Sequence, residues 1–375
     1  MKKTKCIVCA GIDLNELIRF DRYPLCIGVL PPELLGKVKS FPLSIGRCND
    51  CSHIQQLNPI ADDHKKILYE DKYSGLLSTV LTPSKGEVGL VETEKSFNFF
   101  MGCGLPRGKV LDIGCYDGYF LSLLKEQGYA VRGIEPNPAG SIAEKKYGIP
   151  VIKDFFSDRY FKPESIDIIV IRNILEHMSN VNDFLKSVVT ILKPGGHIFI
   201  EVPNVLSSFK EGALGCFFHQ HLSYFSLEVL LYLLSRYSLE HVSSCEDYFI
   251  YLCVRKNKEN ARRSSVVNKR AYRLNKEVDA YFSKFEKRRL DLMKLLGSED
   301  KVAIFGAGGN TTGLIHMLGR SLSQKIKYVY DNNKLKHGNL LAELPLEVKA
   351  PELMKEDKPN FVVISTYLHQ KAIVE

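Results

Sequence analysis

The sequence predicts an α/β protein built around a central Rossmann-like domain, with a small cysteine-bearing module before it and a second Rossmann-like α/β domain after it. Three observations lead to this fold class: two strand–glycine–helix patterns, two matched CxxC pairs near the N-terminus, and a length of 375 residues, which suits two or three domains. The expected divisions are a module over 1–70, the central domain over 71–255, a helical linker over 256–297 and the last domain over 298–375.

The central domain is predicted from KVLDIGCYDGYFLSLLKEQGYAVRGIEPNP, which runs from Lys109 to Pro138. VLDIG has the pattern of a short buried strand, DGYFLSLLKEQG that of an amphipathic helix, and AVRGIEP that of a second strand. Together they make a βαβ unit of the nucleotide-binding kind. Gly114 lets the backbone approach a ligand closely, and Glu135, 21 residues later, suits a carboxylate that accepts from both ribose hydroxyls.

The loop GCYDG indicates which ligand this unit takes. A dinucleotide site would have three glycines in GxGxxG, whereas this loop is one glycine short and carries Asp117. An anionic side chain at a helix start repels pyrophosphate but suits the sulfonium and amino groups of S-adenosylmethionine. The pattern therefore predicts a class I methyltransferase domain, in which Asp112, Asp117 and Gly118 lie near the methionine end of the cofactor.

Later segments continue the same domain. DIIVI and HIFIEVP predict two more buried strands, and the helix between them is expected to end at a reverse turn in LKPGG. Asp154 follows the short strand PVIK and is expected to reach the adenine amino group, with Asp158 close by.

The four cysteines of the two CxxC pairs predict a structural zinc site: Cys6, Cys9, Cys48 and Cys51. Each pair directs two thiolates to one point, and two pairs complete a tetrahedral shell for Zn²⁺. The alternatives are four reduced, unbound cysteines or a thioredoxin-like CxxC, and neither explains two matched pairs. The long gap between the pairs requires a strand-and-loop excursion, and His53 is a possible substitute ligand.

With these pieces placed, the whole chain resembles the deoxysugar C-methyltransferases, which have an N-terminal four-cysteine zinc module, an S-adenosylmethionine domain and a C-terminal Rossmann-like domain. DIGCYDG resembles that family's DIGxNDG loop, with Tyr116 in place of Asn. NILEH resembles N-x-L-x-H and would place Asn173 and His177 at the site. FFHQHLSYFS resembles Y-H-E-H-x-S-Y-F-S and would place His219, His221, Ser223 and Tyr224 there.

The resemblance implies methylation of the carbon beside the ketone of a nucleotide-linked 4-keto-6-deoxysugar. His221 is then the candidate base, and His219, His177 and Tyr73, in EDKYSG, are candidates to hold the enolate oxygen. Gln220 replaces the family's glutamate and Phe218 its tyrosine, so Gln220 can orient a histidine but adds no charge. Chelation of a metal by an extended H-x-H and simple packing of both histidines in the core are the competing interpretations.

The last domain opens with VAIFGAGG, a strand followed by a glycine turn, and its helix is expected from Thr311. Asp331 ends the next strand, KYVYDNN, where a ribose-binding acid would stand in an NAD site. The turn lacks a third glycine at the usual spacing, which favours the role of this domain in the resembled family, namely packing over the active site and helping to bind the nucleotide sugar.

Charge and composition leave several functions open. The net charge is +8, and much of it lies between residues 255 and 289, which is either a solvated helix face or a surface that meets phosphates. This basic stretch and the zinc module leave RNA methylation as an alternative. Gln220 in place of the family's glutamate leaves two more: O-methylation of a sugar or other small molecule, and cofactor binding without turnover. We expect a cytoplasmic monomer or weak dimer that binds a nucleotide-linked sugar and no nucleic acid. A membrane partner is not expected either, because apolar runs long enough to span a bilayer are missing.

Overall fold

The structure is a computed structural model, which describes residues 4–25, 27–60, 87–213, 215–257, 267–297, 301–342, 344–366 and 373. Tyr73, one of the residues expected to hold the enolate oxygen, lies outside the described residues. None of the described helices is long and apolar enough to cross a membrane.

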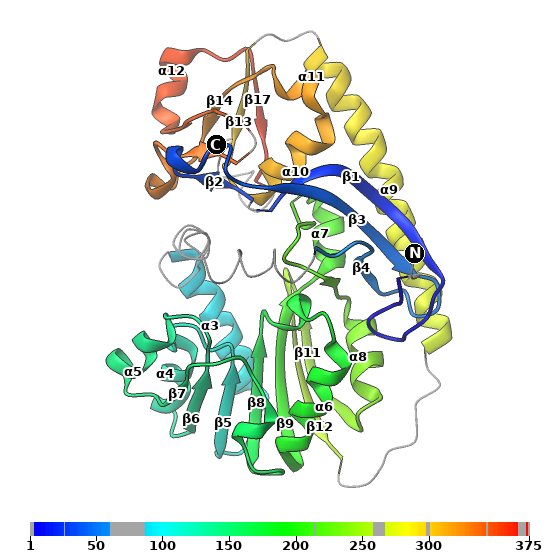
Figure 1. Ribbon diagram of the computed structural model, residues 1–375, viewed down its shortest axis with the longest axis vertical. Coiled ribbons are helices and arrows are strands. Elements are labelled where there is room, and N and C mark those ends of the chain that lie inside the picture. Colours follow the sequence, from blue (N-terminus) through cyan, green and yellow to red (C-terminus); the bar gives the residue numbers. More distant parts are fainter. Residues whose placement is uncertain are drawn as a thin grey trace.

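The central domain is a seven-stranded sheet, shown in the lower half of Figure 1. Its strands lie in the order β11 (Leu239–Glu246), β12 (Phe249–Lys256), β9 (Leu192–Pro203), β8 (Ile166–Arg172), β5 (Lys109–Ile113), β6 (Ala130–Ile134) and β7 (Val151–Ile152). The strands from β9 to β7 are parallel to one another, and β12 runs antiparallel to β9. Strand β11 is antiparallel to β12 and therefore points the same way as β9. The carboxyl ends of the parallel strands therefore meet at one edge of the sheet. The chain adds β6 and β7 on one side of β5 and then β8 and β9 on its other side, and ligands of such sheets bind at this switch point.

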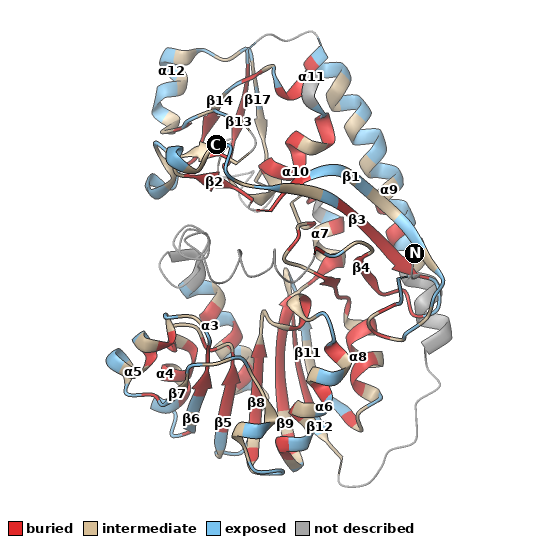
Figure 2. Ribbon diagram, in the orientation of Figure 1, coloured by how far each residue is buried: buried red, intermediate tan, exposed pale blue. Residues whose placement is uncertain are grey.

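Helices and short 3₁₀ turns accompany this sheet: α3 (Glu87–Gly102), α4 (Tyr119–Glu126), α5 (Gly140–Tyr147), η3 (Asp158–Tyr160), η4 (Leu175–His177), α6 (Val181–Ile191), α7 (Val205–Glu211) and α8 (Leu227–Ser235). The strands β5, β8 and β9 are buried along most of their length, as Figure 2 shows. Near-continuous apolar runs such as DIIVI are the expected sequence of strands covered on both faces.

The segment LKPGG differs from our expectation. Instead of forming a turn before the strand, it lies within β9, which begins at Leu192. Leu192 pairs with Ile166 and His197 with Ile168, so the residues between Leu192 and His197 bulge out of the ladder, and Gly195 adopts a φ of 77°. The glycine supplies the left-handed conformation that this bulge requires.

The N-terminal module forms an antiparallel sheet whose strands are β1 (Leu14–Pro24), β3 (Ser40–Cys48), β4 (Ile54–Gln56) and β10 (Ser223–Tyr224). Its edge strand β10 comes from the histidine-bearing segment 217–226. Between β1 and β3, the chain makes the expected excursion through β2 (Val29–Leu30) and η1 (Pro32–Leu34). This excursion reaches the last domain, where β2 pairs with β15 (Leu340–Leu341).

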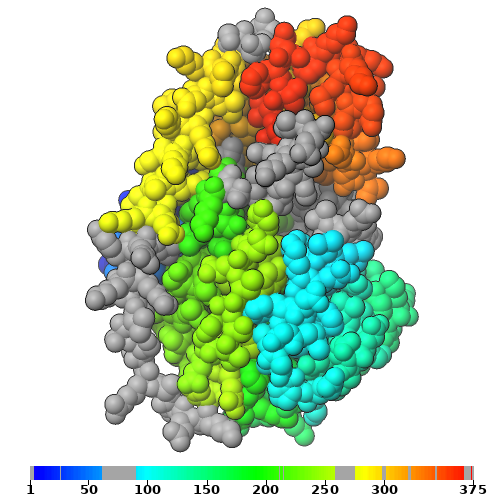
Figure 3. Space-filling model, turned by 180° about the vertical axis from the view of Figure 1, so that it is seen from behind, coloured from blue at the N-terminus to red at the C-terminus, as the bar shows by residue number. Residues whose placement is uncertain are grey.

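The last domain is a parallel sheet in the order β16 (Val348–Lys349), β14 (Ile326–Tyr330), β13 (Val302–Phe305) and β17 (Phe361–Ile364). Its helical elements are α10 (Gly309–Leu318), α11 (Arg320–Ser323), η5 (Lys334–Lys336), η6 (Pro351–Leu353) and α12 (Met354–Asp357). Helix α10 thus begins two residues before Thr311. The long helix α9 (Val267–Gly297) runs along the back of the molecule, from the last domain to the central domain (Figure 3).

Candidate functional site

The loop after β5 is shaped by two glycines with positive φ. Gly114 has a φ of 79°, and a Cβ there would lie 2.4 Å from Cδ1 of Ile174. Gly118 has a φ of 78°, and its Cβ would lie 2.4 Å from that of Ala143. Both positions therefore require glycine, which keeps the loop tight against the carboxyl ends of the strands.

Tyr116, between these glycines, also lies in the left-handed region, with a φ of 48°. Asn, the residue of the resembled family's loop, adopts this conformation readily, whereas Tyr does so at a cost. The peptide N–H of Tyr116 donates to Oε2 of Glu135 at 3.0 Å. The loop is thus tied to the acid at the end of β6.

Glu135 follows β6 directly and is 7% exposed. Its Oε1 accepts from the N–H of Asn137 at 2.7 Å, so each oxygen has one backbone donor and one lone pair to spare. Burial raises the pKa of Glu135, and the two backbone hydrogen bonds oppose that shift. The carboxylate can still accept from a diol.

Asp112 is the penultimate residue of β5 and is 2% exposed, and its Oδ1 has no partner among the described residues. Burial raises the pKa of Asp112 to about 7, while the charge of Arg172 lowers it. Arg172 itself pairs with Glu201 at 2.6 Å, and its guanidinium lies 4.4 Å from the centre of the Phe120 ring. An unpartnered acceptor at this place suits a ligand that brings a donor or a positive charge.

The remaining cofactor candidates have partners within the chain. Asp117 accepts from the N–H of Tyr119 at 3.1 Å through Oδ1, and Asn173 donates to Oε1 of Glu201 at 3.0 Å through Nδ2. Asp154 follows β7, is 43% exposed and accepts from Tyr160 and from Arg159. Asp117 lies on the loop after β5, Asp154 on the loop after β7 and Asn173 on the loop after β8. Because these strands are parallel, the structure brings all three residues to the same edge of the sheet.

Within FFHQHLSYFS, the part that carries both histidines is a turn and lacks the extended form that chelation by H-x-H would need. The N–H of His221 donates to the carbonyl of Phe218 at 3.1 Å, which closes a four-residue turn around His219 and Gln220. His219 is 1% exposed, and its Nε2 donates to the carbonyl of Tyr23 at 3.1 Å. The two imidazoles therefore meet different surroundings, and His219 behaves as a packed core histidine.

The N-terminal module holds this turn in place. The Nε2 of Gln56, on β4, donates to the carbonyls of Phe218 and His221 at 2.9 and 2.7 Å. His53 is fully buried and its Nε2 lies 3.1 Å from the hydroxyl of Ser223. Gln56 was missed by sequence reasoning, because nothing local distinguishes a positioning glutamine from a surface one.

His177 and His221 come together from different parts of the chain, with ring centroids 4.9 Å apart. His177 donates Nδ1–H to the carbonyl of Gln220 at 2.8 Å, and the ring of His221 packs against Phe218 with centroids 4.0 Å apart. Burial lowers the pKa of both histidines. Glu176, which sequence reasoning also missed, lies beside them, with its Oε1 3.9 Å from Nε2 of His177.

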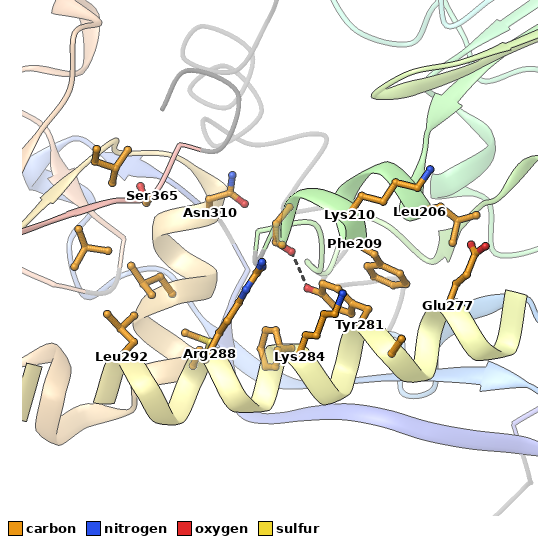
Figure 4. A pocket seen from close by; sticks show the side chains of 18 residues that line it. Leu206, Phe209, Lys210, Glu277, Tyr281, Lys284, Arg288, Leu292, Asn310 and Ser365 are labelled. Atoms are coloured by element: carbon orange, nitrogen blue, oxygen red, sulfur yellow. Dashed lines mark hydrogen bonds between the residues drawn. The ribbon is translucent and has the colours of Figure 1, made fainter. Parts of the chain in front are cut away.

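His221 lines a cavity of about 340 Å³ between the central and last domains, together with Phe218, Tyr224, Tyr248 and Asn310. Ala213 and Asn310 also line a second cavity, of about 490 Å³, so the two cavities adjoin. Figure 4 shows the second cavity between α7, α9 and α10, with Lys210, Lys284 and Arg288 around it. Glu277 is the acidic residue of this lining, so positive charge predominates.

The four cysteines of the N-terminal module gather into one cluster, in which all sulfur atoms lie within 4.8 Å of one another. The Sγ of Cys6 lies 3.6 Å from that of Cys51, and the Sγ of Cys9 lies 3.6 Å from that of Cys48. Each CxxC pair forms the same kind of turn. The N–H of Ala10 donates to the carbonyl of Cys6, and the N–H of Ser52 donates to the carbonyl of Cys48, both at 2.8 Å. His53 contacts Ser223, so within this module the four thiols are the group that could hold a metal.

Asp331, the residue that would bind ribose in an NAD site, is engaged by its own domain. Its Oδ2 accepts from the N–H of Ala307 at 2.8 Å and from Nζ of Lys336 at 2.7 Å, and its Oδ1 accepts from the N–H of Asn333 at 2.8 Å. A lysine beside this carboxylate favours a structural role for Asp331 over the binding of a diol.

Comparison with known proteins gives two adjacent family matches. Residues 91–244 match a methyltransferase domain, and residues 251–375 match a C-methyltransferase C-terminal domain. The C-methyltransferase NovU of Streptomyces niveus is 22% identical over an alignment that covers 99% of this chain and 91% of that protein.

Two further likenesses are local. The ubiquinone biosynthesis O-methyltransferase of Proteus mirabilis is 31% identical over 108 residues, which are 27% of this chain and 44% of that protein. The crystal structure of the PH0226 protein from Pyrococcus horikoshii has a TM-score of 0.41 and 17% identity, over 50% of this chain and 99% of that one. With the class I strand order and the two family matches, this chain is an S-adenosylmethionine-dependent methyltransferase, and it is similar to a C-methyltransferase over nearly its whole length.

Proposed function

We propose that this enzyme methylates the carbon beside the ketone of a nucleotide-linked 4-keto-6-deoxysugar, through an enolate. The observation that carries the proposal is the pair of adjoining cavities: His221 lines one, and Lys210, Lys284 and Arg288 lie in the largely apolar wall of the other. A keto sugar with a diphosphate attached has the matching chemistry, because its acidic C–H lies at one end and its negative charge at the other.

The cofactor belongs at the carboxyl edge of the central sheet. The tight turn at Gly114 and Gly118, the diol-accepting Glu135 and the unpartnered Asp112 fit an adenosyl group linked to a cationic methionine. Asp117, Asn173 and Asp154 complete the proposed binding set. When bound there, S-adenosylmethionine supplies an electrophilic methyl group.

In the proposed chemistry, His221 takes the proton from the carbon beside the ketone. Burial keeps its imidazole neutral and thus able to accept. Tyr73 holds the enolate oxygen. His177, whose Nδ1–H is donated to the carbonyl of Gln220, supports His221 through ring contact. His219, which is bonded to the carbonyl of Tyr23, positions the turn instead of contacting substrate.

The nucleotide end of the substrate is assigned to the larger cavity. Lys210, Lys284 and Arg288 can meet the diphosphate, and the aromatic side chains of Phe209 and Tyr281 line the same cavity. Phe209 and Tyr281 stack on each other with centroids 4.1 Å apart, and the Tyr281 hydroxyl donates to the carbonyl of Ala213 at 3.0 Å. A preformed wall of this kind suits a nucleoside.

The cysteine cluster is proposed to hold a structural Zn²⁺. A tetrahedron with Zn–S bonds of about 2.3 Å has sulfur–sulfur edges of about 3.8 Å, which is close to the 3.6 Å pairs observed. The ion would join the two ends of the module, and it would support β4, whose Gln56 holds the histidine turn.

The test is proton NMR of a nucleotide-linked 4-keto-6-deoxyhexose in D₂O, with the enzyme and S-adenosylmethionine. Deuterium incorporation beside the ketone and a new C-methyl signal are the expected result. If the enzyme binds S-adenosylmethionine and neither signal grows, the proposal is wrong. A new O-methyl signal would instead show that Gln220 marks a site rebuilt for hydroxyl acceptors.

A further inference from the structure

Glu176 is a buried acid that the chemistry described so far does not use. Its side chain is 2% exposed, and its Oε2 has no hydrogen-bond partner among the described residues. A carboxylate charge in such surroundings is strongly disfavoured unless a proton or a cation comes to it. The neighbours of Glu176 therefore decide what it does.

The nearest ionisable neighbours are the two histidines of the site. The carboxylate and one ring nitrogen from each of His177 and His221 all lie within 4.8 Å of one another. Because Nδ1–H of His177 donates to the carbonyl of Gln220, the lone pair of this ring is on Nε2, the atom 3.9 Å from Oε1 of Glu176. Two acceptors that face each other are stabilised by a proton between them.

The backbone holds this arrangement from both sides. The N–H of Leu222 donates to the carbonyl of Glu176 at 2.7 Å, so the loop that carries Glu176 and His177 is bonded directly to the turn that carries His221. Among the described residues, the charge of Glu201 also reaches Glu176, and Glu201 is paired with Arg172. Glu176 is therefore the side chain whose negative charge is available to a protonated imidazole here.

We infer that Glu176 is a positioning residue. From its place beside His177, its carboxylate supplies the negative charge that the neutral Gln220 does not. This charge makes the two histidines an effective proton acceptor. The inference rests on the proposed function. When the C–H bond beside the ketone breaks, its proton goes to His221 and its electron pair stays on the substrate as the enolate. The imidazolium that forms is balanced by the carboxylate, and the proton later leaves to solvent.

The proton affinity of such a cluster belongs to the three groups jointly. Burial raises the pKa of Glu176 to about 8, with a further contribution from Glu201, while burial lowers the pKa of each histidine. A base must be unprotonated to act, so kcat/KM should fall as the pH drops through the pKa of the cluster. Without the carboxylate the histidines bind a proton less tightly, so this limb should move to lower pH.

The experiment compares the unmodified enzyme with Glu176→Gln, with the double variant Glu176→Gln/Gln220→Glu, and with the exposed control Glu126→Gln. The measurements are the pH profile of deuterium exchange beside the ketone and the pH titration of the Cε1–H signals of His177 and His221 in the substrate-free protein. We expect Glu176→Gln to lose about 10²-fold in kcat/KM and to shift the limb down by about one pH unit or more. The double variant should regain most of the loss, and the control should match the unmodified enzyme.

Several results would overturn the inference. An unchanged histidine titration in Glu176→Gln would show that the carboxylate is not coupled to the imidazoles, and a failure of the double variant to recover would indicate a merely structural glutamate. A metal equivalent beyond that of the cysteine cluster, lost in Glu176→Gln, would make the cluster a metal site. If Glu176→Gln does not fold, Glu176→Asp keeps the charge and should keep the histidine titration of the unmodified enzyme. A shift of that titration to lower pH would contradict the inference.

The histidine titration is independent of turnover, which separates the two proposals. Coupled titration without turnover of a keto sugar would contradict the proposed substrate class and leave the role of Glu176 intact. Turnover with an uncoupled titration would support the proposed function and show that Glu176 does not have the inferred role.

Discussion

At the scale of single residues, His221 is where the parts of the site meet. Its ring contacts His177 and Phe218 and lines the smaller cavity, while its backbone carbonyl accepts from Gln56 of the N-terminal module. Few other positions in the described chain join the central sheet, the module and the cavity in this way. A change at His221 should therefore affect chemistry more than cofactor binding.

For His221→Ala we expect kcat/KM to fall by at least about 10²-fold, since general base catalysis is lost, while the affinity for S-adenosylmethionine stays unchanged. A methyl-transfer assay and calorimetric titration with the cofactor measure the two effects. His241→Ala, at an exposed position on β11, is the matched control. Retained activity in His221→Ala would show that His221 is not the general base.

Gln220 lies between the two histidines, where the resembled family has glutamate. Gln220→Glu should preserve or increase C-methylation, because a carboxylate there adds negative charge beside His221 without altering the backbone carbonyl that binds His177. The initial rate of C-methyl formation measures the effect. A sharp loss would mean that this site has been rebuilt around the neutral amide.

At the scale of elements, the cysteine cluster and strand β4 act together. Cys48 ends β3, Cys51 lies in the turn before β4, and Gln56 ends β4 with its two hydrogen bonds to the histidine turn. We therefore expect a disturbance at the thiols to reach the histidine turn over a short, hydrogen-bonded stretch.

Metal analysis should find about one zinc per chain, and Cys48→Ser should lose it. We expect the variant to be destabilised by about 3 kcal/mol or more, which corresponds to a fall in Tm of roughly 10 °C, and to lose activity as the turn loosens. Elemental analysis, thermal melts and the methyl-transfer assay are the measurements. Cys245→Ser, at an exposed free cysteine, should change none of them.

Helix α9 presents Lys284 and Arg288 to the larger cavity, one turn apart (Figure 4). Lys284→Ala and Arg288→Ala should each raise KM for the nucleotide-linked sugar by about 10-fold, equivalent to about 1.4 kcal/mol, with little change in kcat. The effect should shrink at high salt. Lys287→Ala, on the same helix but outside the cavity lining, should behave like the unmodified enzyme, and an equal rise in its KM would contradict a specific diphosphate site.

At the scale of the whole molecule, the active site depends on how the three parts of the chain are joined. Strand β2 of the module pairs with β15 of the last domain, strand β10 of the histidine segment pairs with β4, and Gly215 packs against the turn that starts α10. The N–H of Gly215 also donates to Oδ1 of Asn310 at 2.7 Å, so a contact between the central and last domains lies in the wall that both cavities share.

Gly215→Ala should separate the last domain from the central one, because a Cβ there would lie 2.2 Å from the backbone nitrogen of Asn310. We expect a destabilisation of about 1–3 kcal/mol and a loss of substrate affinity, while S-adenosylmethionine still binds. Denaturant unfolding and calorimetry check both. Gly102→Ala, where a Cβ meets nothing within 4 Å, is the control, and equal behaviour of the two variants would show that this contact is not tight.

The sequence by itself determined the features that depend on local patterns. Strand–glycine–helix periodicity identified the β5–α4–β6 unit and the opening of the last domain, and CxxC spacing identified the cysteines that the fold gathers. Glu135 was recognisable because its distance along the chain from Gly114 reflects a fixed βαβ geometry. These signals are local, so they survive without knowledge of the fold.

Only the tertiary structure decided which of the polar residues meet. It closed FFHQH into a turn, turned His219 toward Tyr23, and brought His177, His221 and Glu176 together from two loops. It also recruited Gln56 from a strand that lies 162 residues before Phe218 in the chain. Contacts of such long range depend on how sheets and loops pack, and sequence periodicity carries no information about which face of one loop meets another.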